Sequence, residues 1–142
     1  MIYTSYFSNV KKLPPNVTPV CITVRKPSWF RGQWYGDLAP EYWILNDWKN
    51  DHDNEKYTER FMKHVLEQRN IIKVMNDFQL MLPIKQRAQM TESVVMSRDY
   101  HIALICYEAP EDFCHRHIVA QWLHSFGIKC EEWMEDCHVE EE

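Results

Sequence analysis

The stretch that decides the fold is Ala103-Leu104-Ile105-Cys106-Tyr107-Glu108-Ala109-Pro110-Glu111-Asp112-Phe113-Cys114-His115-Arg116-His117. Residues 100–107 form a nearly continuous apolar run without a charged side chain, which is typical of a strand covered on both faces. Periodicity alone also allows a buried helix, but Pro110 follows closely, lacks a backbone donor and favours extended geometry before it. We therefore expect a buried strand that ends near Tyr107.

A helix is expected directly after this break, with its cap at Pro110 or Glu111. Glu111 and Asp112 would then lie near its first turn, where the helix dipole favours acidic side chains. Gly127 is placed to end the helix in a left-handed conformation, and residues 128–133 alternate like a second strand. Strand, helix and strand form a right-handed crossover unit with parallel strands. The apolar stripe of the helix comprises Val119, Trp122, Leu123 and Phe126.

The junction of this strand and helix collects five reactive or charged side chains. In such units, ligands bind at the carboxyl ends of the strands beside the helix N-terminus, whose N–H groups also stabilise a thiolate. Cys114 is therefore a candidate thiolate and Arg116 a candidate anion clamp. The alternative is that Cys114 is a small buried hydrophobe and Arg116 a surface partner of Glu111 or Asp112. The five residues are Cys106, Glu108, Cys114, His115 and Arg116.

Length and charge narrow the class of protein. The 142 residues are enough for one domain, and the net charge of −5 speaks against a broad basic surface for nonspecific nucleic-acid binding. No stretch approaches membrane-spanning length, and the chain begins in a strand-like pattern without a basic leader. Five cysteines without an export signal favour reduced thiols over a disulfide framework. We expect a cytoplasmic protein without a membrane segment.

Two further strands are expected, at residues 2–6 and 19–24. If the sheet is parallel, their ends lie beside the end of the strand at 100–107. Arg25 and Ser28 follow the second strand and join the candidate binding residues. Thr4, Ser5 and Asn9 join them from the first strand.

The segment 27–40 is rich in Trp, Tyr and Gly, and a long irregular loop of this kind is often functional. Its aromatic residues, among them Trp29, could stack on a base or ring. The alternative is a loop that covers the edge of the sheet. Helices are expected at 41–49, 54–69 and 71–82, an insertion or mobile loop at 83–98, and an acidic tail at 135–142.

The metal-ligand residue types do not have the spacing of a zinc knuckle. Seven residues separate Cys106 from Cys114, and His115 and His117 diverge on a helix and cannot both contact one ion. We read Asp51-His52-Asp53 as a solvated loop with an N-cap. We expect no metal and no cofactor, and favour Cys–His chemistry with helix N–H groups as an oxyanion site.

The chain resembles the family called domain of unknown function 488. The similarity rests on Cys106-x-Glu108-x-Pro110 and Cys114-His115-Arg116, followed by an apolar helix and a final strand. The opening residues 3–9 and the Val24-Arg25 pair near Pro27 resemble the family's first two strands, and residues 38–40 resemble its compact bacterial and prophage-type members. The resemblance implies a Rossmann-like three-layer α/β domain and a shared site of Cys114, His115, Arg116, Glu108 and Arg25. It implies no particular activity.

We therefore expect a single α/β domain over residues 1–142, with a mainly parallel sheet of about four to five strands. The favoured function is a small enzyme for a phosphate-bearing, nucleotide-like or nucleic-acid substrate. Cys114, His115 and Glu108 would carry the chemistry, with Arg116, Arg25 and Cys106 beside them. The alternatives are a binding module for an anion, nucleic acid or protein, and a structural zinc domain.

Overall fold

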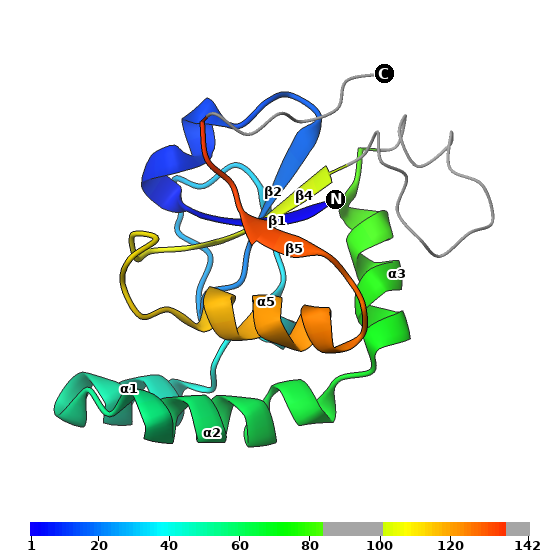
Figure 1. The fold of residues 1–142 in the computed structure, drawn as a ribbon. Helices are drawn as coiled ribbons and strands as arrows, with labels where there is room; N and C mark the ends of the chain where they lie inside the picture. The colour runs from blue at the N-terminus through cyan, green and yellow to red at the C-terminus, as the bar shows by residue number, and fades with distance from the viewer. Residues whose placement is uncertain (84–100, 136–142) are drawn as a thin grey trace.

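The computed structural model describes residues 1–83 and 101–135. Its centre is a five-stranded sheet in the order β3-β2-β4-β1-β5, and every pair of neighbouring strands is parallel. The strands are β1 (Ile2–Tyr6), β2 (Val17–Cys21), β3 (Gln33–Trp34), β4 (His101–Cys106) and β5 (Cys130–Glu132). The predicted α/β class with a Rossmann-like parallel sheet is confirmed (Figure 1).

Strand β4 lies at the centre of this sheet because its sequence is apolar on both faces. All six of its residues are buried, and it pairs with β2 on one side and β1 on the other. The crossover from β4 to β5 passes over β1, so the two strands are parallel but not adjacent. This order brings the carboxyl ends of β2, β4 and β1 side by side.

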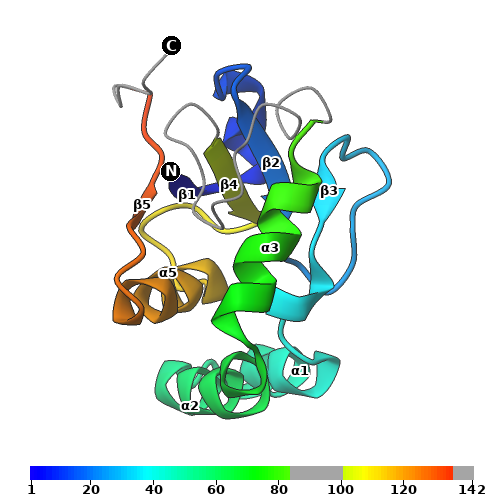
Figure 2. The ribbon, with the colours of Figure 1, turned by 90° about the vertical axis from the view of Figure 1, so that its right-hand side faces the viewer.

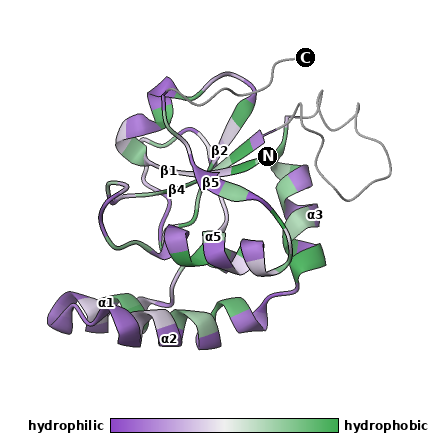
Figure 3. Ribbon diagram, viewed as in Figure 1, coloured by the Kyte–Doolittle hydropathy of each residue, from purple (hydrophilic) through white to green (hydrophobic). Residues whose placement is uncertain are grey.

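Four α-helices are described: α1 (Tyr42–Asp51), α2 (Asn54–His64), α3 (Ile71–Met81) and α5 (His115–Ser125). Figures 1 and 2 show α5 between the sheet and the α1–α2 pair, with α3 beside it. Hydrophilic and hydrophobic residues alternate along α1 and α2, as expected for helices with one solvent face (Figure 3). Short 3-10 helices are η1 (Phe7–Lys12), η2 (Gly36–Leu38) and η3 (Leu66–Gln68).

The core has two parts, one on each face of the sheet. The larger part joins Val20 and Leu104 of the strands to Phe61, Phe78 and other residues of the helices. The smaller part joins Ile105 and its neighbours to Phe30 and Trp133, with η1 packed against it. No helix in the described ranges is long and apolar enough to cross a membrane.

The loop between α1 and α2 is a helix cap, as predicted. Asp53 is the N-cap of α2, and its carboxylate accepts a hydrogen bond of 3.0 Å from the Lys56 N–H. His52 ends α1 in the left-handed region at φ 53°.

The structure corrects two predicted boundaries and adds one strand. Helix α5 begins at His115 with Cys114 as its N-cap, so Glu111 and Asp112 lie in the loop before it and not at its first turn. Strand β2 spans Val17–Cys21 rather than 19–24, and the aromatic loop contains a short strand, β3, that the sequence pattern does not reveal. Apart from Pro83 and Glu135, the predicted insertion at 83–98 and the acidic tail at 135–142 lie outside the described residues.

Candidate functional site

A pocket of about 230 Å³ opens at the carboxyl edge of the sheet. Its walls come from the ends of β2 and β4, the amino end of α5, and the helices α1 and α2. Parallel α/β sheets place their ligand sites at this edge, because the strands end there together and the helix amino ends face it. Five of the site residues proposed from the sequence line this pocket: Arg25, Cys106, Glu108, Cys114 and His115.

Aromatic side chains form one wall of the pocket. Trp48 of α1 stacks on Phe113 with 5.8 Å between ring centroids, and Tyr57 of α2 meets Phe113 edge-on at 5.2 Å. Burial raises the pKa of Tyr57, so its hydroxyl stays protonated at neutral pH. Tyr42 and Tyr107 also line the pocket and are largely exposed.

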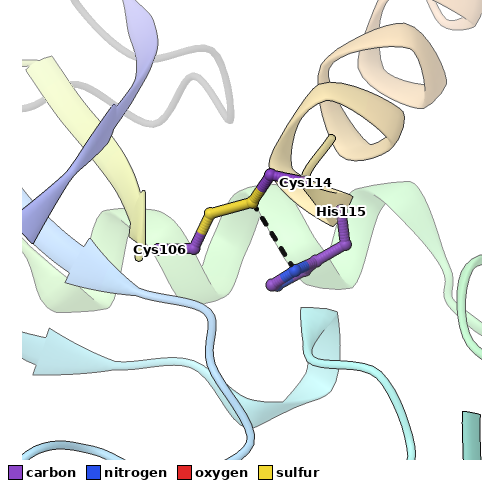
Figure 4. Close-up of side chains that lie close together, drawn as sticks. All are labelled: Cys106, Cys114 and His115. Carbon is purple, nitrogen blue, oxygen red and sulfur yellow. Dashed lines mark hydrogen bonds between the residues drawn. A yellow bond between two sulfur atoms is a disulfide. The ribbon is translucent and has the colours of Figure 1, made fainter. Parts of the chain in front are cut away.

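A disulfide joins Cys106 at the end of β4 to Cys114 at the N-cap of α5 (Figure 4). The expectation of reduced thiols is therefore wrong for this pair. The sequence does not reveal that Cys106 and Cys114 are close, because seven residues separate them. They meet because the loop after β4 brings the chain back to the end of that strand. Cys21 and Cys130 are free and buried, and burial raises the pKa of Cys130 to about 12.

His115 is held by the neighbouring strand. Its Nε2 lies 2.5 Å from the carbonyl oxygen of Ile22, just after β2, and a carbonyl can only accept, so Nε2 carries the proton. Nδ1 then has the lone pair, and it lies 3.9 Å from Cys114 Sγ (Figure 4). Burial lowers the pKa of His115 to about 4, so the ring is neutral at physiological pH.

Arg116 is fully buried and does not line the pocket. Its Nε and Nη2 donate to the carboxylate of Glu132 at 3.1 and 3.0 Å. Its Nη1 donates to Glu108 O at 2.7 Å and contacts Cys106 Sγ at 3.0 Å. Neither Glu111 nor Asp112 is the partner that the sequence suggested. Each nitrogen of the guanidinium is thus engaged by the protein, which fixes the β4–α5 loop.

Arg25 and Glu108 carry the charge around the pocket. Arg25 is exposed and makes no ion pair within the described parts of the chain. A hydrogen bond of 2.6 Å from the Thr23 hydroxyl to the carbonyl oxygen of Arg25 shapes the turn that presents it. Glu108 is half-buried, two residues after the end of β4, and lines the same pocket.

Five other candidate binding residues lie away from this pocket. Thr4 is buried and donates to Glu132 at 2.6 Å, while the buried Asn9 amide contacts the Ser5 hydroxyl at 3.5 Å. Ser28 and Trp29 are exposed, and the Trp29 ring packs edge-on against Phe7 at 5.1 Å between ring centroids. These residues support the strand ends or lie on a different surface.

Sequence reasoning did not identify Glu132 or the aromatic wall from α1 and α2. Glu132 has no local signal, because its partner Arg116 is distant in space until β5 joins the sheet. Trp48 and Tyr57 do have one: aromatic residues recur on two helices that are joined by a tight cap. That signal identifies an apolar face, and the tertiary structure shows that part of it lines a pocket.

These features define a parallel α/β domain with a sulfur–imidazole cluster at the floor of an aromatic pocket. A family model described as "DUF488-N3a: Active DUF488-N3 subclade" matches residues 14–127. The chain belongs to the domain of unknown function 488 family. No curated protein and no solved structure shows significant similarity to it.

Proposed function

We propose that this protein is a small enzyme that acts on a phosphate-bearing, nucleotide-like substrate, either free or within a nucleic acid. The observation that carries the proposal is a single pocket with an aromatic wall, a cation at its rim and a sulfur–imidazole cluster at its floor. Each of these parts matches one part of such a substrate.

The wall suits a planar ring. Aromatic faces stack on bases with about 1–3 kcal/mol per base, and this energy depends little on which base is present. The half-exposed Trp48 and the exposed Tyr42 are the surfaces for stacking. Arg25 is the anion-binding residue, because its guanidinium is exposed and free of carboxylate partners within the described residues.

The floor supplies the chemistry. In the reduced protein, Cys114 is either a nucleophile or a thiol that positions other groups, and His115 Nδ1, 3.9 Å from its sulfur, is an acceptor for the thiol proton. Glu108 is the carboxylate available for proton transfer at the same pocket. Arg116 acts as a positioning residue that holds Glu108 and Cys106, rather than as the anion clamp.

A non-catalytic binding module is the second candidate, and the disulfide favours it. While Cys106 and Cys114 are joined, no thiol among the described residues lines the pocket, and the aromatic wall and Arg25 could bind a ligand without reacting. Alkylation by iodoacetamide after reduction separates the two candidates. The enzyme predicts that Cys114 reacts rapidly below pH 8, whereas the module predicts the rate of an ordinary thiol.

Binding is tested by calorimetry of the purified protein against nucleoside monophosphates, dinucleotides and short single-stranded oligonucleotides. We expect at least one class to bind, and Arg25→Ala to weaken its binding about tenfold at low salt. Arg31→Ala is the matched control, because Arg31 is also exposed but does not line the pocket. The proposal fails if no class binds, or if both variants lose affinity equally.

The cytoplasmic location is part of the same proposal. Two unpaired buried thiols, Cys21 and Cys130, suit a reducing compartment, in which the Cys106–Cys114 pair would also open.

A further inference from the structure

Three soft metal ligands converge at the floor of the pocket. The sulfur atoms of Cys106 and Cys114 and a ring nitrogen of His115 all lie within 4.8 Å of one another, and all three residues are buried. We propose that the reduced protein holds one divalent ion of the zinc type on Cys106, Cys114 and His115, with its fourth coordination position open to the pocket. This inference rests on the proposed function, which names the substrate that would reach the open position. It makes Cys114 a metal ligand that positions other groups, and not the nucleophile.

The hydrogen bond of His115 Nε2 orients the ring so that Nδ1 can bind the ion. Histidine ligands usually donate their other ring N–H to a carbonyl or carboxylate, which fixes the tautomer and aims the free nitrogen at the ion. The contact of Nε2 with the Ile22 carbonyl oxygen at 2.5 Å does this here. It directs the lone pair of Nδ1 to the sulfur pair, as Figure 4 shows.

The two cysteines have the backbone spacing and the electrostatic support for thiolates. Their Cα atoms are 7.6 Å apart, beyond the range of about 4.4 to 6.8 Å usual for a disulfide, which leaves room for sulfurs that separate around an ion. The buried Arg116 guanidinium lies 3.0 Å from Cys106 Sγ, and a fixed cation there stabilises the thiolate form.

The ligand set distinguishes this site from a structural zinc domain, the alternative raised by the metal-ligand residue types in the sequence. Structural sites close the ion with four protein ligands, whereas catalytic sites keep three and leave one position for water or substrate. The described residues supply three donors, two sulfurs and one imidazole, a set that zinc adopts in catalytic sites. Hard ions such as Mg²⁺ prefer oxygen ligands, so the set selects against them.

Loading the site requires reduction first. A phosphine reductant donates two electrons to the Cys106–Cys114 bond and leaves as its oxide after taking oxygen from water, which yields two thiols. Binding of M²⁺ then releases both thiol protons and forms two metal–sulfur bonds and one metal–nitrogen bond. The neutral His115 contributes no proton. The ion and the disulfide therefore exclude each other, and oxidation of the pair would expel the ion.

The test titrates the reduced, chelator-treated protein with Co²⁺ under anaerobic conditions and records the visible spectrum. We expect one equivalent to bind with the sulfur-to-cobalt charge-transfer and tetrahedral d–d bands, and Zn²⁺ to displace it. Cys106→Ser, Cys114→Ser and His115→Gln should each weaken binding at least about tenfold. Cys130→Ala is the matched control, because this buried thiol lies outside the cluster.

Circular dichroism of each variant confirms that it is folded before its affinity is compared. A reduced wild-type protein that binds no Co²⁺, or binding that survives in Cys106→Ser and Cys114→Ser, overturns the inference. Nucleotide binding measured in the presence of chelator reports separately on the proposed function. Loss of metal binding with nucleotide binding intact rejects only the metal site, and the reverse result rejects only the substrate class.

Discussion

Arg116 and Glu132 form a bidentate ion pair, with Nε to Oε1 at 3.1 Å and Nη2 to Oε2 at 3.0 Å, while the guanidinium is 0% exposed. The pair ties helix α5 to strand β5 across the carboxyl edge of the sheet. Because α5 begins at His115 with Cys114 as its N-cap, this bond fixes the floor of the pocket to β5.

Arg116→Met should strongly destabilise the protein, because it leaves the Glu132 carboxylate in a partly buried site without its cation. Breaking a buried pair by removing one partner costs about 3–5 kcal/mol, which urea denaturation measures directly. Lys12→Ala is the control, since its ion pair with Glu135 is exposed to solvent and should contribute far less to stability. Equal losses in the two variants would show that burial of the pair does not matter.

Burial of neutral His115 makes the stability of the oxidised protein depend on pH. The pKa of His115 is lowered from 6.5 to about 4. Between pH 6.5 and pH 4, the imidazole therefore binds a proton in the unfolded chain and stays neutral in the folded one. The contribution of neutral His115 to the free energy of unfolding is complete above pH 6.5. It declines as the pH falls toward 4, by at most about 3 kcal/mol.

His115→Gln lacks this proton uptake while keeping an amide that can donate to the Ile22 carbonyl. Denaturation between pH 4 and 6.5, with chelator present and the disulfide intact, should show a smaller loss of stability on acidification for the variant than for the wild type. Parallel pH profiles for both proteins would show that His115 is protonated as easily in the folded state as in the unfolded one.

Trp48→Ala should weaken binding of any ring-bearing ligand about 10- to 100-fold, because a stacking surface of about 1–3 kcal/mol is removed. The matched control is Trp43→Ala on the same helix, since Trp43 is 40% exposed and does not line the pocket. Fluorescence or calorimetric titration with the best nucleotide ligand measures the difference. If both variants bind like the wild type, the aromatic wall does not contact the ligand.

Gly127→Ala should cost about 1 kcal/mol of stability, because φ is +76° at this position and a Cβ is disfavoured there. No heavy atom lies within 4 Å of the added Cβ, so the cost is one of backbone conformation rather than of space. Gly127→Asn should cost less, since Asn tolerates the left-handed region. Thermal denaturation compares the two, and equal losses would contradict the explanation.

The amino-acid sequence by itself determined the elements that local chemistry controls. The apolar run before Pro110 predicts the buried strand β4, and the apolar stripe predicts α5. Gly127 marks the end of α5, where the Ile128 N–H donates to the Leu123 carbonyl oxygen at 3.1 Å. Asp53 as the cap of α2 belongs with them. Each of these depends on residues within a few positions of one another, and their patterns can be read along the chain.

Only the tertiary structure decided which bonds and contacts form at the pocket. The Cys106–Cys114 bond, the Arg116–Glu132 pair and the contact of His115 with Ile22 join residues 8, 16 and 93 positions apart. The aromatic wall likewise comes from helices that precede the motif by about half the chain. Such contacts arise from the order of strands in the sheet, and side-chain spacing in the sequence carries no record of that order.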